Sequence, residues 1–293
     1  MSEKKIELYK TRDFGEKINA TIEYIRFNFG PLIKVVLVLV LPLGIVASLM
    51  LKNIFGTFGG MMSNPNMDEV ERVGQLSSLG GNYMLTMIMS MVTYSFLVAA
   101  IYTFLSRRDK GESVEPMEVI KEALKSVPGL FGLMIVTGIL TVLGFFVFIL
   151  PGIYLAFVFS LSFPIYMFEG QDFGTAFSKP FKLIRDKWWS TFGLLIITSI
   201  IAAVISYVFL IPSYAIMFGQ MFSDPETLQN DPNAVFESLS SWTTTITMAF
   251  AMMGTYLTYL IPIIALGFQY FNLSERMEGT GLKNQIQDFE NLG

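Results

Sequence analysis

The stretch PLIKVVLVLVLPLGIVASLML, from Pro31 to Leu51, decides the fold class, because Lys34 is its one charged residue. A helix needs roughly 20 apolar residues to cross the ~30 Å hydrocarbon core of a bilayer. Five further stretches have the same character, and the fourth span is the shortest. The six predicted spans are Pro31–Leu51, Tyr83–Leu105, Gly129–Leu150, Pro151–Phe168, Phe192–Leu210 and Trp242–Tyr270. The sequence therefore predicts an all-α, polytopic membrane protein with six transmembrane helices.

The basic residues gather on one side of these spans. We assign four segments to the cytoplasmic side, namely the two termini, Ser106–Pro128 and Glu169–Thr191. With Lys34 included, these segments hold 18 of the 20 Lys and Arg residues. Only Lys52 and Arg72 fall elsewhere. Because Lys and Arg are retained on the cytoplasmic side, we predict a multi-pass protein of the bacterial plasma membrane with both termini in the cytoplasm. The net charge of −4 gives no indication of a nucleic-acid partner.

Three copies of one unit are predicted, each an amphipathic cytoplasmic helix followed by a membrane hairpin. The first and third copies align without a gap, since Asp13-Phe14-Gly15 matches Asp172-Phe173-Gly174. The predicted organisation is one membrane domain over 1–293. Its parts are repeat units at about 11–105, 112–169 and 171–273, exterior loops at about 52–82 and 212–241, and a cytoplasmic tail at 274–293.

The amphipathic helices carry apolar residues at steps of three and four, which puts them on one face of a helix. In the first copy the positions are Phe14, Ile18, Ile22, Ile25 and Phe29, and in the third they are Phe173, Phe177, Phe181, Ile184 and Trp188. The looser middle copy has Met117, Ile120, Leu124 and Val127. Such helices either lie in the membrane interface or pack against one another beneath the bundle.

The third amphipathic helix supplies the candidate site. A basic edge beside an apolar face suits contact with lipid headgroups, and Trp is enriched where a chain enters the bilayer. The candidate residues for the lipid headgroup or interface are Lys179, Lys182, Arg185, Lys187, Trp188 and Trp189. Membrane lipids are thus the expected partners, together with another membrane or cytoplasmic protein.

The predicted spans hold no ionisable residue at depth, which argues against ion-coupled transport. Scattered hydroxyl groups and Gln269 are typical of helix packing, but a polar cavity for a lipid-like or small neutral solute stays open as an alternative. The chain has no His and no Cys, so His-based acid–base catalysis and thiol chemistry are excluded. No catalytic residue, cofactor or metal site is predicted. The first span is expected to serve as an uncleaved signal anchor.

Acidic residues cluster in two places and are interpreted as solvated helix faces and caps. They are Asp68, Glu69 and Glu71 on the predicted exterior, and Glu112, Glu115, Glu118 and Glu122 on the predicted cytoplasmic side. Glu169 is the best remaining candidate for a membrane-embedded lipid enzyme, a remote alternative that requires convergent acids beside a pocket.

A family resemblance rests on short motifs in Ser113–Gly281. They are Leu150-Pro151-Gly152-Ile153-Tyr154, Phe163-Pro164, Glu169, Ala176, Trp188-Trp189, Tyr270-Phe271-Asn272-Leu273, Arg276 and Glu278-Gly279. This pattern resembles the membrane domain attached to some bacterial glycerophosphoryl diester phosphodiesterases, and its stand-alone multispan relatives. Pro180 departs from it, where a small hydroxyl residue is expected. In such fused proteins the catalytic unit is a separate soluble barrel, so the resemblance implies an accessory membrane module without that activity.

These observations favour a non-catalytic membrane scaffold or accessory protein that engages lipid headgroups and a protein partner at its cytoplasmic face. A transporter of lipid-like or small neutral solutes is the alternative.

Overall fold

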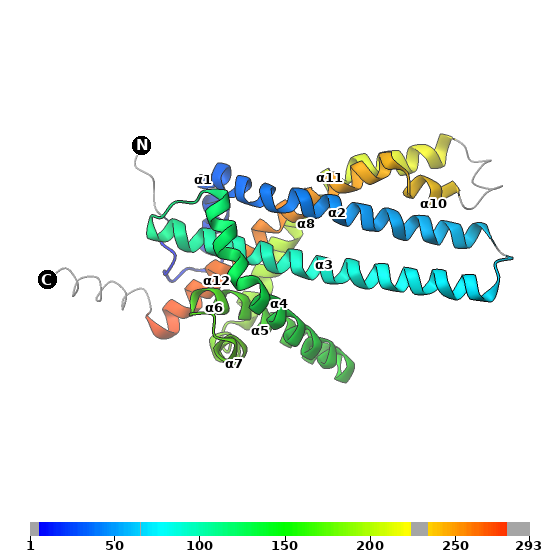
Figure 1. Ribbon diagram of the computed structural model, residues 1–293. Coiled ribbons are helices and arrows are strands. Elements are labelled where there is room, and N and C mark those ends of the chain that lie inside the picture. The colour runs from blue at the N-terminus through cyan, green and yellow to red at the C-terminus, as the bar shows by residue number, and fades with distance from the viewer. Residues whose placement is uncertain (1–5, 65, 224–233, 280–293) are drawn as a thin grey trace. The chain divides into compact units, whose positions relative to one another are not determined.

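The computed structural model describes residues 6–64, 66–223 and 234–279, and these residues form helices joined by short connections (Figure 1). No strand occurs in these residues. The helices are α1 (Phe14–Phe27), α2 (Phe29–Ser63), α3 (Glu69–Lys110), α4 (Pro116–Val147), α5 (Ile149–Ser160), α6 (Ser162–Phe168), α7 (Phe173–Leu183), α8 (Trp188–Ser223), α10 (Ala234–Leu239), α11 (Trp242–Thr258) and α12 (Leu260–Glu278).

Six segments are long and apolar enough to cross a membrane, which confirms the predicted number of spans and a multi-pass membrane protein. Two of the segments are broken by a single residue. The fourth span consists of α5 and α6, and the sixth of α11 and α12. Pro164 and Pro262 lie in the first turn of α6 and α12, where proline is tolerated because the missing N–H has no partner within the helix. The spans are Phe29–Ser63, Glu69–Lys110, Pro116–Val147, Ile149–Phe168, Trp188–Gly219 and Trp242–Glu278.

The predicted exterior loops are shorter than expected. Helix α2 continues to Ser63 and α3 begins at Glu69, so most of the loop placed at about 52–82 is helix. Helices α8 and α10 likewise occupy much of the loop placed at 212–241, of which residues 224–233 lie outside the described part. Gly, Ser and Asn suggested loops there, but a helix satisfies its own backbone hydrogen bonds and tolerates these residues. Residues 274–278 of the predicted tail belong to α12, and residues 280–293 lie outside the described part.

The chain divides into two compact units. Unit 1 comprises the described residues within Met1–Val36, Ser95–Ala202 and Tyr259–Gly293, and unit 2 those within Leu37–Tyr94 and Ala203–Thr258. In unit 1, α1 packs on α12, and the segments 97–105 and 263–274 are buried almost without interruption. The Tyr102 hydroxyl donates to the Ile263 carbonyl oxygen at 3.0 Å, which joins these two segments.

The N-terminal segment of unit 1 is fixed to α12 by polar and aromatic contacts. The Arg12 backbone N–H donates to Asn272 Oδ1 at 2.7 Å, and Arg276 Nη2 donates to the Arg12 carbonyl oxygen at 3.2 Å. The rings of Tyr9 and Phe271 meet edge to face at 4.8 Å. Asn272 and Arg276, both from the resemblance motifs, therefore position the start of the chain.

Unit 2 is held by close helix approaches. Gly254 of α11 faces Phe209 of α8, and the hydroxyls of Ser206 and Thr258 lie 2.6 Å apart on the same two helices. Lys52 of α2 donates to the Ser240 carbonyl oxygen, and its ammonium group lies 4.7 Å from the Trp242 ring centre.

Candidate functional site

The predicted headgroup residues fall into two groups. Lys179 lies among carboxylates, because its Nζ is 2.8 Å from Glu169 and 2.7 Å from Glu278. Partial burial by itself lowers the pKa of Lys179, but the hydrogen bonds to the two carboxylates outweigh it and the pKa is raised. Lys179 is thus a charged structural residue of unit 1, and its charge is already balanced by Glu169 and Glu278.

The other basic candidates lie in the last turn of α7 and in the segment that follows it. Lys182, Arg185 and Lys187 are exposed. The Trp189 side chain is 77% exposed beside them, whereas Trp188 is half-buried and stacks on Phe192 with ring centres 5.2 Å apart. We call Lys182, Arg185, Lys187 and Trp189 the basic edge.

The apolar stripes of the first two amphipathic helices are partly turned outward, whereas the third packs into unit 1, with Ile184 buried and Phe177 and Phe181 against Phe159. In α1 the buried residues are Lys17, Ala20, Thr21 and Tyr24, whereas Ile22 of the predicted stripe is 51% exposed. The start of α4 repeats this arrangement, with small residues buried and larger ones exposed. Val119, Ala123 and Ser126 are buried there, and Met117 and Leu124 are exposed. In a chain that crosses a membrane, an outward apolar face suits contact with lipid chains.

Two aspartates begin the first and third amphipathic helices in the same way. Asp13 accepts from the Glu16 N–H at 2.7 Å and Asp172 from the Thr175 N–H at 2.6 Å. At Asp172 the hydrogen bonds from Thr175 lower the pKa of the carboxyl group. An N-cap of this kind satisfies backbone donors that the helix leaves unpaired.

Burial of the polar side of α1 places Lys17 inside unit 1, where its side chain is among the largest fully buried ones. Only 2% of the residue is exposed. Its ammonium donates to Gln269 Oε1 at 2.6 Å and to Ser190 Oγ at 2.7 Å, and Gln269 Nε2 donates onward to Thr191 Oγ1 at 2.8 Å. Among the described residues no carboxylate forms an ion pair with Lys17. Neutral oxygens therefore stabilise a buried cation, which is a costly arrangement.

Stability is expected to depend on pH through Lys17. Burial, reinforced by Arg276 and Lys187, lowers its pKa from 10.5 to about 8. Between those values the unfolded chain binds more protons than the folded one, so stability rises with pH. Going from pH 7 to 9.5, wild type should gain about 2 kcal/mol relative to Lys17→Met, at roughly 1.36 kcal/mol per pKa unit. Unfolding in detergent at both pH values measures this difference, and a difference that is constant with pH contradicts the assignment.

Residues of the resemblance motifs meet around Lys179. The Tyr270 hydroxyl donates to Glu169 Oε1 at 2.8 Å, and Phe168 stacks on Tyr270 with ring centres 5.6 Å apart. Burial raises the pKa of Tyr9 to about 12, despite a hydrogen bond with Tyr270 that lowers it. Two carboxylates, Glu169 and Glu278, thus converge on one ammonium group, and neither of them lines the cavities described below.

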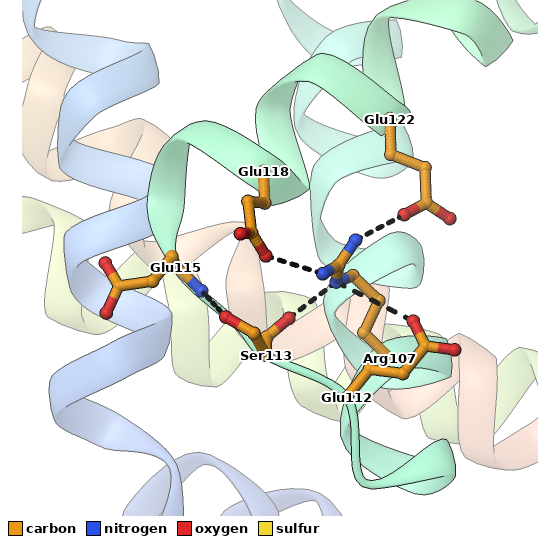
Figure 2. Close-up of polar contacts among 6 residues, drawn as sticks. All are labelled: Arg107, Glu112, Ser113, Glu115, Glu118 and Glu122. Atoms are coloured by element: carbon orange, nitrogen blue, oxygen red, sulfur yellow. Dashed lines mark hydrogen bonds and ion pairs between the residues drawn. The ribbon is translucent and has the colours of Figure 1, made fainter.

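The acidic cluster on α4 is engaged by one arginine. Arg107 forms ion pairs with Glu118 at 2.7 Å, Glu122 at 2.8 Å and Glu112 at 3.9 Å, and Figure 2 shows these side chains around it. Arg107 Nε also donates to the Ser113 carbonyl oxygen at 2.6 Å, which fixes the turn between α3 and α4. About half of the Glu118 and Glu122 side-chain surface is exposed, at 53% and 48%, so these ion pairs are surface contacts. The cluster links the end of α3 to the start of α4. The sequence analysis interpreted its carboxylates as solvated, whereas Glu118 and Glu122 are paired with Arg107.

Each unit contains a cavity. A cavity of about 380 Å³ in unit 1 is lined by residues that include Tyr24, Arg108 and Lys110. A cavity of about 740 Å³ in unit 2 is lined by polar residues and glycines, Lys52 and Glu71 among them. In the described residues, no group of three or more His, Cys, Asp or Glu is arranged to hold a metal ion.

Sequence reasoning missed Lys17 and Tyr24. An apolar stripe on an amphipathic helix is ordinarily assigned to the protein side, which leaves Lys17 in water. One signal was present, namely Gln269, a long polar side chain within a predicted span. A buried amide needs partners, and a lysine on a neighbouring helix supplies one.

A family model described as "Domain of unknown function (DUF7847)" matches residues 28–261, which contain α2 through α11. Comparison with curated proteins and with solved structures gives no match. Since the matched segment covers most of the chain, the protein belongs to the DUF7847 family, a domain of unknown function.

Proposed function

We propose that the protein is a non-catalytic membrane scaffold or accessory protein. It engages lipid headgroups and a protein partner at its cytoplasmic face, in the plasma membrane of a bacterium, with both termini in the cytoplasm. The observation that carries the proposal is the exposed part of the apolar stripe of α1 and of the start of α4, together with the exposed basic edge at the end of α7 and beyond it. Apolar side chains enter the lipid while Lys and Arg reach the headgroups.

The basic edge is well suited to anionic lipid. Each Lys or Arg near an anionic surface contributes about 1 kcal/mol, and Trp189 adds an amphipathic ring at the same depth. The half-buried Trp188 anchors this segment by stacking on Phe192 and Tyr154, whose ring centres lie 5.2 and 6.2 Å away. Lys179 is excluded from the headgroup role, because Glu169 and Glu278 already balance its charge.

Changing Lys182, Arg185 and Lys187 together to Gln is expected to reduce retention of anionic lipid. The loss of about 3 kcal/mol corresponds to roughly a hundredfold weaker retention. Native mass spectrometry of protein extracted from membranes of phosphatidylglycerol and phosphatidylcholine measures it. The matched control keeps the charge, with Lys182→Arg, Arg185→Lys and Lys187→Arg, and should retain lipid as wild type does. Unchanged lipid retention and unchanged co-purification of partner proteins in the Gln variant contradict the proposal.

We further propose an internal repeat and a family relationship for this chain. Three repeat units, each an amphipathic helix and a hairpin, are supported by the equivalent N-caps of Asp13 and Asp172 and by the outward stripes of α1 and α4. Kinship with the membrane domain of glycerophosphoryl diester phosphodiesterases is also part of the proposal and rests on the short sequence motifs, of which Glu169, Tyr270 and Glu278 meet around Lys179.

Transport of a small neutral solute is the second candidate, and the cavity of unit 2 favours it. Its lining includes Asn53, Thr57, Gln75 and Ser78, which offer neutral hydrogen-bonding groups. Uptake of a solute into proteoliposomes distinguishes a transporter from a scaffold.

A further inference from the structure

The cavity of unit 1 combines cations, hydroxyl and apolar surface at one end of α3. Its volume is about 380 Å³, within the range of small-molecule sites, ≈ 300–1,000 Å³. The lining residues that matter here are Tyr24, Phe27, Asn28, Leu105, Arg108 and Lys110. None of them belongs to the basic edge.

The Tyr24 hydroxyl is the first sign of a ligand. Tyr24 is 4% exposed and packs edge to face on Phe268, with ring centres 5.8 Å apart. Its hydroxyl oxygen is buried and has no hydrogen-bond partner among the described residues. Burial accordingly raises the pKa of Tyr24, so the hydroxyl keeps its proton and stays a donor at neutral pH. An unpaired buried donor is rare in native proteins and calls for an acceptor that completes it.

Asn28 holds a guanidinium group at the same cavity. Its Nδ2 donates to the Tyr24 carbonyl oxygen at 3.0 Å, and its Oδ1 accepts from Arg108 Nε at 2.9 Å. One amide therefore fixes Arg108 relative to the turn of α1 that carries Tyr24. A guanidinium positioned in this way matches the oxygens of a phosphate group.

The charge of the lining sets the charge of the ligand. Arg108 and Lys110 contribute two positive charges and Asp109 one negative charge, which leaves a single positive charge. A lipid phosphate carrying one negative charge complements it. The apolar residues Phe27, which is 55% exposed, and Leu105 lie beside these groups and suit the start of an acyl chain.

We propose that this cavity binds the phosphate of a membrane phospholipid headgroup, with the Tyr24 hydroxyl and the Arg108 guanidinium as donors. Lys110 adds electrostatic attraction at the rim. The site rests on the proposed lipid-engaging function and gives it a specific position, separate from the diffuse attraction at the basic edge.

The test removes one oxygen atom, with Tyr24→Phe. Dihexanoyl phosphatidylglycerol is titrated into the full chain in a neutral detergent, and its dissociation constant is measured by calorimetry. A hydrogen bond to a charged group is lost, so affinity should fall about tenfold or more. The midpoint of thermal unfolding without lipid should not fall, because this hydroxyl bonds nothing in the described residues. Unchanged affinity in Tyr24→Phe overturns the proposal.

Tyr102→Phe is the matched control. Its hydroxyl donates to the Ile263 carbonyl oxygen, so the same change should lower the unfolding midpoint and leave lipid affinity within about twofold. If both variants lose affinity to the same extent, the loss reflects general loosening of unit 1 and the proposal fails. A second probe of the site is Lys110→Gln, whose exposed side chain should weaken binding about fivefold without affecting folding.

Three ligands identify the source of the phosphate. Dihexanoylglycerol lacks the phosphate and should not compete, whereas glycerophosphoglycerol and inorganic phosphate should compete only weakly. If either of these two competes as strongly as the lipid, the site takes a free phosphate compound and the lipid assignment is overturned. The Gln variant of the basic edge separates the two proposals. If the Gln variant retains less lipid but Tyr24→Phe binds dihexanoyl phosphatidylglycerol as wild type does, only the cavity site is contradicted. If Tyr24→Phe binds it more weakly but the Gln variant retains lipid as wild type does, only the role of the basic edge is contradicted.

Discussion

Replacement of Gln269 by leucine is expected to destabilise unit 1 by about 3 kcal/mol, since an unsatisfied buried polar group costs about 1–3 kcal/mol and a charged one costs more. Gln269 is fully buried and accepts from the Lys17 ammonium at 2.6 Å. Its amide also donates to Thr191 Oγ1. Among the described residues, leucine leaves the buried cation with Ser190 as its acceptor and leaves Thr191 without the Gln269 donor. Chemical unfolding in mixed micelles measures the change.

A double-mutant cycle separates this pair from general packing loss. Lys17→Met removes the buried cation, so the double variant with Gln269→Leu places two apolar side chains of similar length together. We expect it to recover most of the stability that Gln269→Leu loses, because a matched apolar pair can replace a buried polar one. Gln269→Glu serves as the conservative control, since a carboxylate accepts from Lys17 and should restore its pKa toward the ordinary value. Strictly additive effects of the two single changes contradict direct coupling.

The spans were predictable because a bilayer imposes length and polarity on any helix that crosses it. Their ends were not, and the stretch after Leu51 shows the reason. Its Gly, Ser and Asn residues favour turns in water, yet α2 runs on to Ser63 and α3 starts at Glu69. Composition measures average polarity, whereas a helix end depends on which backbone groups find partners.

The sequence left open whether α1 lies in the membrane interface or packs beneath the bundle, and neither alternative identified Lys17 as a buried residue. The periodicity of Phe14, Ile18 and Ile22 correctly identified a helix with two faces. In a soluble domain the apolar face turns inward, but beside a bilayer either face meets a suitable environment. Here Lys17 and Tyr24 turn inward and Ile22 turns outward.

Long-range partners explain the remaining differences at the candidate site. Lys179 looked equivalent to Lys182 because both lie on the same basic helix. The structure separates them through Glu278, which is 99 residues away in the sequence. No local pattern identifies such a pair, since the contact depends on how α7 and α12 pack.

Glycine at position 254 is expected to be essential for the packing of α8 against α11 in unit 2. A Cβ there would lie 2.0 Å from Phe209 Cγ and 2.4 Å from Phe209 Cβ. Because Phe209 Cβ is fixed to its own backbone, a ring rotation does not remove the clash, and the helices must separate. Gly254→Ala should therefore cost about 3 kcal/mol, the upper part of the usual range for overpacking. Gly219→Ala, in α8 with nothing within 4 Å of its Cβ, is the control and should be neutral.

The separation itself is measurable one helical turn away, where Ser206 and Thr258 have hydroxyls 2.6 Å apart. The chain contains no cysteine, so Ser206→Cys and Thr258→Cys introduce the one thiol pair available for oxidation. A disulfide needs the two Cβ atoms within about 4.5 Å, and a shift of the helices by an ångström or two is enough to prevent it. We expect rapid cross-linking in the otherwise unchanged chain and with Gly219→Ala, and little with Gly254→Ala. Equal cross-linking in all three would mean that α11 accommodates a methyl group at position 254 without moving, and that Phe209 is not what sets the distance between the helices.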